Sequence, residues 1–297
     1  MDYYLGILTV ICINVVAVLG VSLLIGFTGV FTFGHAAYMA IGAYTSALLT
    51  LKAGTPFLVS LAGGAILAML AAVPIGYPTL RLSGDYFVVA SLGVAEIVVL
   101  LIENMHGITG GARGLVGIPV KSRFPIVALI AVACTWFIRN FVNSRLGRNC
   151  VALRENELAA QTIAINPFRH KMMALVISAG LGGLAGGLLA HYTGVLHPSM
   201  FAFVKSEELV ISVIFGGIGS VTGSVLSAVI LTFLPEALRA VAEWRLVIYG
   251  VLVVIIIIAR PQGLLGYREI TLEYLRKRLL YSRAKPQANR PTGGDAP

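Results

Sequence analysis

Residues 143–171 read NSRLGRNCVALRENELAAQTIAINPFRHK, the longest clearly polar interval between apolar runs in this 297-residue chain. Loops rich in Lys and Arg gather on the cytoplasmic side of membrane proteins. We therefore expect the interval to face the cytoplasm and to contact a partner there. Its basic residues are Arg145, Arg148, Arg154, Arg169 and Lys171.

The composition of the whole chain indicates a membrane protein. Hydrophobic residues make up 58% of the chain, charged residues 12%, and the mean hydropathy is +0.89. A bilayer-spanning helix needs about 20 mostly apolar residues, and long continuous runs predict helices and not a β-barrel. We expect an all-α polytopic integral membrane helical bundle with about 8–9 transmembrane segments, two broken or re-entrant elements and no soluble domain. The runs lie at 5–27, 36–51, 57–77, 86–102, 125–142, 172–190 and 244–259, with a broken run at 207–236.

The basic residues predict an orientation. With residues 143–171 in the cytoplasm, most of the 22 Lys and Arg residues fall on the cytoplasmic side. This choice places the N-terminus outside and the C-terminus inside, and it requires the interval 207–236 to cross twice. The net charge of +9 follows from these loops, so it does not predict nucleic-acid binding. The cations left outside are Lys52, Arg113, Lys121, Arg123, Lys205, Arg239 and Arg245.

Two glycine-rich segments interrupt the apolar runs, at 26–35 and at 216–224. Paired broken segments are typical of transporters in which two repeats meet around a path near mid-membrane. Their neutral donors and acceptors suit a zwitterionic or neutral polar solute better than a free ion. The candidate path residues are Thr28, Gly29, Thr32, Gly34, His35, Gly216, Gly217 and Ser220.

Glu96 lies inside an apolar run, where an ionisable side chain is costly and usually functional. Lining the path and bonding to a neighbouring helix are equally good interpretations. In another run, Gly182 with Gly186 and Gly183 with Gly187 form overlapping GxxxG spacings, which let helix backbones approach closely. We favour packing inside the bundle over dimerisation for these glycines.

No catalytic or metal-binding constellation is expected. Cys12, Cys134 and Cys150 have no CxxC or Cys/His spacing and fit ordinary apolar positions. The five histidines form no HExxH motif, and no GK[ST] follows the glycines of 107–117. The sequence therefore predicts neither an enzyme nor an ATP site.

Within the polar interval, residues 155–165 predict a short surface helix that ends at Asn166 and Pro167. Ala159 and Ala160 give its centre little bulk, so it could enter a groove on another protein. Arg154, Glu157 and Arg169 would pair with that partner at the rim. A solvated helical linker is the alternative.

Several motifs together carry a family resemblance over residues 26–266. They read GFTG and GHAAY at 26–38, LRLSGDYF at 80–87, LRENELAA at 153–160, FGGIGS at 215–220 and RPQGL at 260–264. The chain resembles the M-type permease subunit of ABC importers for branched-chain amino acids, a family that also includes urea and short-amide permeases.

The resemblance implies that the polar interval is a coupling loop for a cytoplasmic ATPase. It implies as partners an H-type permease, two ABC ATPase subunits that bind ATP and Mg, and a periplasmic or extracellular solute-binding protein. No cofactor would belong to this chain. Ala164 stands where the family's loop usually has glycine. The implied coupling residues are Arg154, Glu155, Asn156, Glu157, Ala159, Ala160 and Asn166.

We therefore expect a permease domain over 1–266 and a basic, amphipathic to disordered cytoplasmic tail over 267–297. The expected function is a permease subunit of an ATP-driven importer in the bacterial inner membrane, carrying branched-chain or related amino acids. Urea or short amides are the alternative solutes. A stand-alone ion-coupled carrier is the alternative mechanism, with Glu96 as its one strong coupling candidate.

Overall fold

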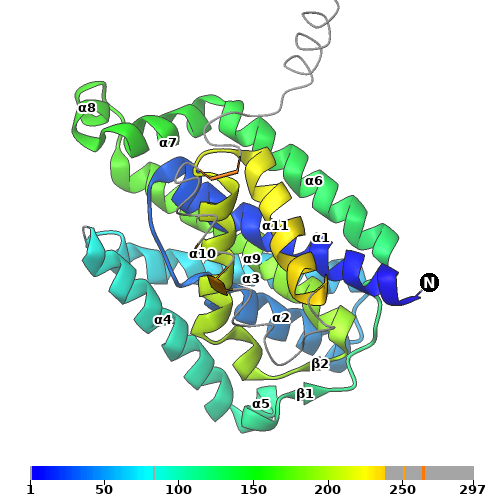
Figure 1. Ribbon diagram of the computed structural model, residues 1–297. Helices are drawn as coiled ribbons and strands as arrows, with labels where there is room; N and C mark the ends of the chain where they lie inside the picture. Colours follow the sequence, from blue (N-terminus) through cyan, green and yellow to red (C-terminus); the bar gives the residue numbers. More distant parts are fainter. Residues whose placement is uncertain (1, 83, 238–249, 252–253, 255–262, 265–297) are drawn as a thin grey trace, which may run out of the picture.

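The computed structural model describes residues 2–82, 84–237, 250–251, 254 and 263–264. Within them the chain is almost entirely helical (Figure 1). The expected run at 244–259 and the tail at 267–297 lie outside the described residues, apart from the few positions just given. The helices are α1 (Asp2–Ser22), α2 (His35–Lys52), α3 (Phe57–Thr79), α4 (Asp85–Asn104), α5 (His106–Thr109), α6 (Phe124–Asn143), α7 (Arg145–Glu155), α8 (Glu157–Thr162), α9 (Pro167–Thr193), α10 (Phe203–Gly216) and α11 (Val221–Ala237).

Five helices in the described part of the chain are long and apolar enough to cross a membrane. They are α1 with its π-helical extension η1 (Leu23–Thr28), α3, α4, α6 and α9. The shorter helices α2, α10 and α11 coincide with the other expected runs that the structure describes. The all-α polytopic membrane fold is therefore confirmed.

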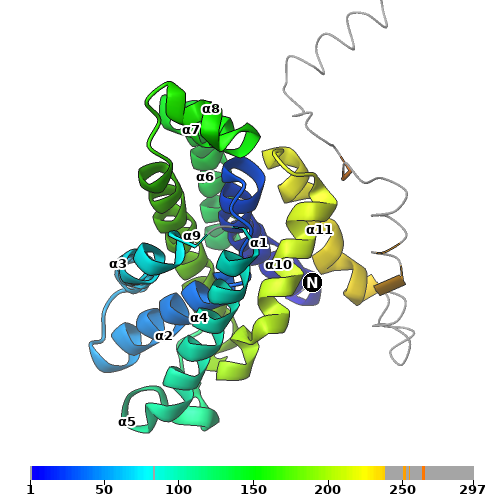
Figure 2. The same cartoon turned by 90° about the vertical axis from the view of Figure 1, so that its left-hand side faces the viewer.

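Helix α9 is the centre of the bundle, and it packs most extensively against α2 and α3 (Figures 1 and 2). Its glycines allow this contact: a Cβ on Gly183 would lie 2.5 Å from the Cβ of Ala68 on α3, and one on Gly186 would overlap the backbone of Met39 on α2. The expected use of the GxxxG spacings for packing inside the bundle is confirmed.

The bundle has two distinct ends, which the figures show at top and bottom. One carries α7 and α8, and we call it the loop end. The other, the sheet end, carries α5, η2 (Gly111–Arg113) and η3 (Pro198–Phe201), with the short antiparallel pair β1 (Leu115–Val116) and β2 (Val195–Leu196). The rings of Phe57 and His191 meet at this end, and Gly6 lies beside the Tyr192 hydroxyl. Four parts of the chain thus share the sheet end, as the predicted alternation of membrane crossings requires. They are the N-terminus and the segments 53–56, 105–123 and 194–202.

Both expected breaks are present. After η1 the chain leaves the helix at Gly29, whose φ is +73°, and stays non-helical until α2 begins at His35. In the second break, α10 ends at Gly216 and α11 begins at Val221. With 14 and 17 residues, α10 and α11 are about 21 and 25 Å long. Each is short for a hydrocarbon core of about 30 Å.

Candidate functional site

The polar interval forms two helices and not the single helix expected over 155–165. Asn156 separates them because it is extended, with φ −158° and ψ 107°. Its side-chain oxygen accepts a hydrogen bond from the amide of Ala159 at 3.0 Å and so caps α8. Asn166 caps α9 in the same way through the amide of Arg169. These two side chains thus fix α8 as a short, separate projection at the loop end.

The exposed surface of α8 is more apolar than expected. Ala159 is exposed, but Ala160 is 3% exposed and packs inward, so the two alanines do not form one docking surface. The large exposed side chains are Leu158, at 76%, and Ile163, at 69%. Neither was among the coupling residues expected from sequence, although two large apolar residues inside an otherwise polar loop were a usable signal.

Four charged residues of the loop pair with each other within the chain. Glu157 pairs with Lys171 at 2.7 Å, and Arg154 pairs with Glu155. Arg154 and Glu157 were expected to pair with a partner protein at a rim, and in this structure their charges have intrachain partners. Arg169 is exposed, as that expectation requires. An ion pair as open to solvent as Glu157 with Lys171 adds about 0–1 kcal/mol of stability.

The two breaks meet at the loop end. A Cβ on Gly26 would lie 3.2 Å from the amide nitrogen of Gly219. Close by, the Ser224 hydroxyl donates to the Ser22 hydroxyl at 2.8 Å, in the buried interface of α11 with α1. The structure thus brings together the candidate path residues that belong to these two turns of chain. They are Thr28, Gly29, Gly216, Gly217 and Ser220.

The remaining residues of the first break lie deeper in the bundle. The imidazole of His35 is fully buried between Gly20 and Gly182, each of whose Cβ positions would approach the ring to about 3 Å. Its Nδ1 lies 3.3 Å from the Ser178 hydroxyl. Gly34 donates to the Thr32 hydroxyl at 3.0 Å. The structure thus places His35 in a packed helix junction, and a path role for it stays a prediction.

Glu96 lies on α4, partly exposed, between buried Ala95 and exposed Ile97. It does not line the cleft described next.

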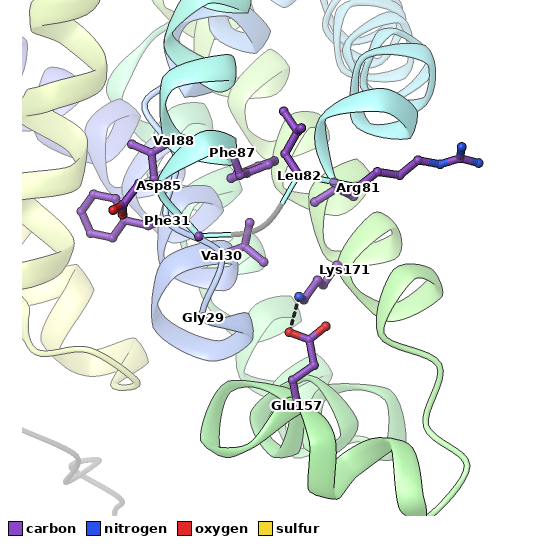
Figure 3. Close-up of a pocket in the computed structure, with 12 residues that line it drawn as sticks. Gly29, Val30, Phe31, Arg81, Leu82, Asp85, Phe87, Val88, Glu157 and Lys171 are labelled. Carbon is purple, nitrogen blue, oxygen red and sulfur yellow. Dashed lines mark hydrogen bonds and ion pairs between the residues drawn. The ribbon is translucent and has the colours of Figure 1, made fainter.

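A cleft of about 340 Å³ opens at the loop end (Figure 3). One wall is the first break from Gly29 to Phe31, and another is the segment that joins α3 to α4. The ion pair of Glu157 and Lys171 borders it, and the apolar side chains of Val30 and Phe87 point toward its middle. The cleft therefore connects the first break to the start of α8, a link that no single sequence motif indicated.

Cys150 shows how closely α7 packs on η1. Its thiol is fully buried, and burial raises its pKa, although an interaction with Thr28 works in the opposite direction. Cys150 therefore remains a protonated thiol at neutral pH. Among the described residues, no group of three His, Cys, Asp or Glu side chains could hold a metal ion.

Comparison with known proteins gives consistent matches. The family model described as "Branched-chain amino acid transport system / permease component" matches residues 3–258. The high-affinity branched-chain amino acid transport system permease protein LivM of Escherichia coli (strain K12) is 33% identical over 291 residues, which cover 86% of this chain and 68% of that protein. LivH of Salmonella typhimurium, a permease protein of the same kind of system, is 27% identical over 288 residues, 85% of this chain and 91% of that protein. No solved structure matches the chain.

Proposed function

Because this chain belongs to the family of branched-chain amino acid transport permease components, we propose that it is a membrane-spanning subunit of an ATP-driven importer. It moves its solute by alternating access between two states. A ligand shifts such an equilibrium only through a difference in its affinity for the two states. Here the nucleotide bound by partner ATPases supplies that difference.

The surface of α8 is the observation that supports this proposal. A short capped helix stands at the end of a membrane bundle, with exposed Leu158 in the helix and exposed Ile163 at its C-cap. Exposed apolar groups rimmed by polar residues mark protein interaction sites. A groove on a cytoplasmic ATPase would accept this helix, as other protein grooves accept apolar helix faces.

The complete importer contains further subunits. LivM and LivH are both permease proteins of branched-chain amino acid transport systems, which supports pairing this M-type chain with an H-type permease. Two ATPases would then dock at the loop end and hold ATP and Mg. A solute-binding protein would deliver a branched-chain amino acid at the sheet end, outside the inner membrane. The chain itself makes and breaks no bonds.

Uptake into proteoliposomes tests this assignment. The chain is reconstituted with its H-type permease, ATPases and binding protein, and the uptake of leucine and of urea is measured. ATP-dependent leucine uptake that survives collapse of the ion gradients is the expected result. Uptake without ATPases that disappears with the gradient would identify an ion-coupled carrier, and uptake of urea alone would reassign the solute.

Leu158 provides a mutational test of docking. Leu158→Asp places a charge at the centre of the apolar contact, and we expect the affinity for the ATPases to fall about 10-fold to 100-fold, as at an interface hot spot. Leu158→Met is the matched control, because it keeps an apolar side chain of similar volume. Co-purification of the ATPases gives the readout. Equal recovery with both variants would remove α8 from the docking surface.

A further inference from the structure

The side chain of Arg154 lies at the junction of three parts of the chain. It projects from the last turn of α7, and 15% of it is exposed. Its Nη1 donates to the carbonyl oxygen of Gly26 at 2.5 Å, across 128 residues of sequence. Its Nε donates to the Glu155 carboxylate at 3.1 Å. One guanidinium thus bridges the coupling loop and the first break.

The carbonyl of Gly26 is a suitable partner for a cation. It belongs to η1, which ends at Thr28, and the last carbonyls of a helix lack partners within the helix. The C-terminal end of a helix also favours a positive charge. A hydrogen bond from a guanidinium is charge-assisted, so it is stronger than one between neutral groups.

The second break closes over the same side chain. A Cβ on Gly219 would lie 2.5 Å from Arg154 Nη1, and one on Gly29 would lie 3.0 Å from its Cγ. Both glycines have positive φ, +91° and +73°. The absence of a side chain at these two glycines therefore makes room for the side chain of Arg154 in each break. Any displacement of Arg154 changes contacts in both breaks.

We propose that Arg154 is a positioning residue that ties the coupling loop to both broken segments, so that movement of docked α8 is passed directly to them. Asn156 alone separates α7 from α8, so Arg154 is close to the docking surface and still points away from it. The inference rests on the proposed function. It assigns Arg154 to transmission inside this chain and not to contact with the ATPase.

Arginine is required because its planar fork serves two acceptors at once, the Gly26 carbonyl and the Glu155 carboxylate. A lysine keeps the charge but has a single nitrogen on a flexible stem. A glutamine loses the charge and most of the donors. Comparing the two variants therefore separates the effect of the positive charge from the effect of the planar fork.

The test uses the complete importer in proteoliposomes, with Arg154→Gln and Arg154→Lys. The measurements are ATPase co-purification, ATP hydrolysis and leucine taken up per ATP. We expect docking and hydrolysis to persist and uptake per ATP to fall about tenfold in Arg154→Gln, on the scale of one lost charge-assisted hydrogen bond. Arg154→Lys should fall between Arg154→Gln and wild type. Arg148→Gln, an exposed cation of the same helix, is the matched control and should couple normally.

Each other outcome overturns the inference. Unchanged uptake per ATP in Arg154→Gln would show that the junction does not transmit movement. Loss of docking would place Arg154 in the ATPase interface. If Arg154→Gln does not fold, normal coupling in Arg154→Lys would reduce the residue to a structural cation. Failure of the unaltered importer to take up leucine with ATP would instead overturn the proposed function itself.

Discussion

Ala164 has a positive φ, +62°, and no other non-glycine residue in the described part of the chain does. It lies just after α8, where its amide donates to the carbonyl of Gln161. The left-handed conformation costs an L-residue about 1–2 kcal/mol, whereas glycine adopts it freely. The backbone of this loop thus has the shape that glycine would accept most easily, and this chain holds it with alanine.

Replacing Ala164 with glycine should stabilise the loop. Removing the steric cost outweighs the extra entropy of an unfolded glycine, so we expect a net gain of about 0.5–1 kcal/mol. Amide hydrogen exchange of residues 157–166 should slow several-fold. Ala159→Gly is the matched control: the same change inside α8 should speed exchange, because glycine is a poor helix former. Faster exchange in Ala164→Gly would contradict this reading of the loop.

At the residue scale, the sequence was better at indicating which residues matter than at predicting what those residues contact. The resemblance marked Ala164 as unusual, and the structure gives the physical reason. It also marked Arg154 and Glu157 as coupling residues, and the pattern of the polar interval assigned both to a partner rim. Their intrachain acceptors and donors come from Gly26 and Lys171, and no local pattern indicates such pairings.

At the scale of elements, the contact of α2 with α9 is the tightest constraint. A Cβ on Gly42 would overlap the backbone of Gly183, so these two helices touch main chain to main chain. Van der Waals packing at such close approach is what holds helices together in lipid. The three atoms nearest the Gly42 Cβ position are all backbone atoms of Gly183, so no side chain there can rearrange to make room.

Adding one methyl group at Gly42 should therefore destabilise the bundle strongly. We expect Gly42→Ala to lower the free energy of unfolding by about 2 kcal/mol or more through overpacking. Gly93→Ala on α4 is the matched control, because nothing lies within 4 Å of its Cβ position. It should be neutral or stabilising by up to about 1 kcal/mol. Thermal unfolding of the purified proteins in detergent distinguishes them, and equal melting temperatures would refute the close contact.

The elements themselves were largely predictable. Apolar runs of about 20 residues and glycine-rich breaks mark the helices and their interruptions directly. The division of the polar interval into α7 and α8 was not predicted, because Asn156 stands among good helix formers. Only its extended backbone and its cap on Ala159 reveal the boundary.

At the scale of the whole molecule, the segments found at each end of the bundle are those that the predicted membrane crossings place on the same side. The direction of the bundle across the membrane is inferred from charge. The loop end carries the cations of 143–171. The sheet end carries Lys52, Arg113, Lys121 and Arg123. By the positive-inside rule, we expect the loop end to face the cytoplasm.

Cysteine labelling checks this orientation in intact cells. A membrane-impermeant maleimide should label Lys52→Cys from outside, and it should label Arg148→Cys only after the membrane is opened. The unaltered chain is the control. Its cysteines should stay largely unlabelled, because Cys134 and Cys150 are buried, Cys12 is only partly exposed, and burial raises the pKa of the Cys150 thiol, leaving little reactive thiolate at neutral pH. The opposite pattern at positions 52 and 148 would invert the topology.

What sequence could not supply at this scale is which distant segments touch. The breaks near residues 26 and 219 resemble each other in composition, but their meeting around Arg154 depends on how α1, α7, α10 and α11 pack. Apolar periodicity gives a helix its buried face without naming the neighbour that covers it.

Helix α1 carries a consequence for how the protein is made. Asn14 donates to Thr232, Ser22 accepts from Ser224, and Tyr3 bonds to Glu236, so α1 has partners more than 200 residues ahead of it. A ribosome adds about 5–20 residues per second. Helix α1 therefore waits on the order of ten seconds or more before α11 exists to cover it. During that time its polar side chains depend on lipid, water or the insertion machinery, and the bundle closes when α11 packs back onto α1.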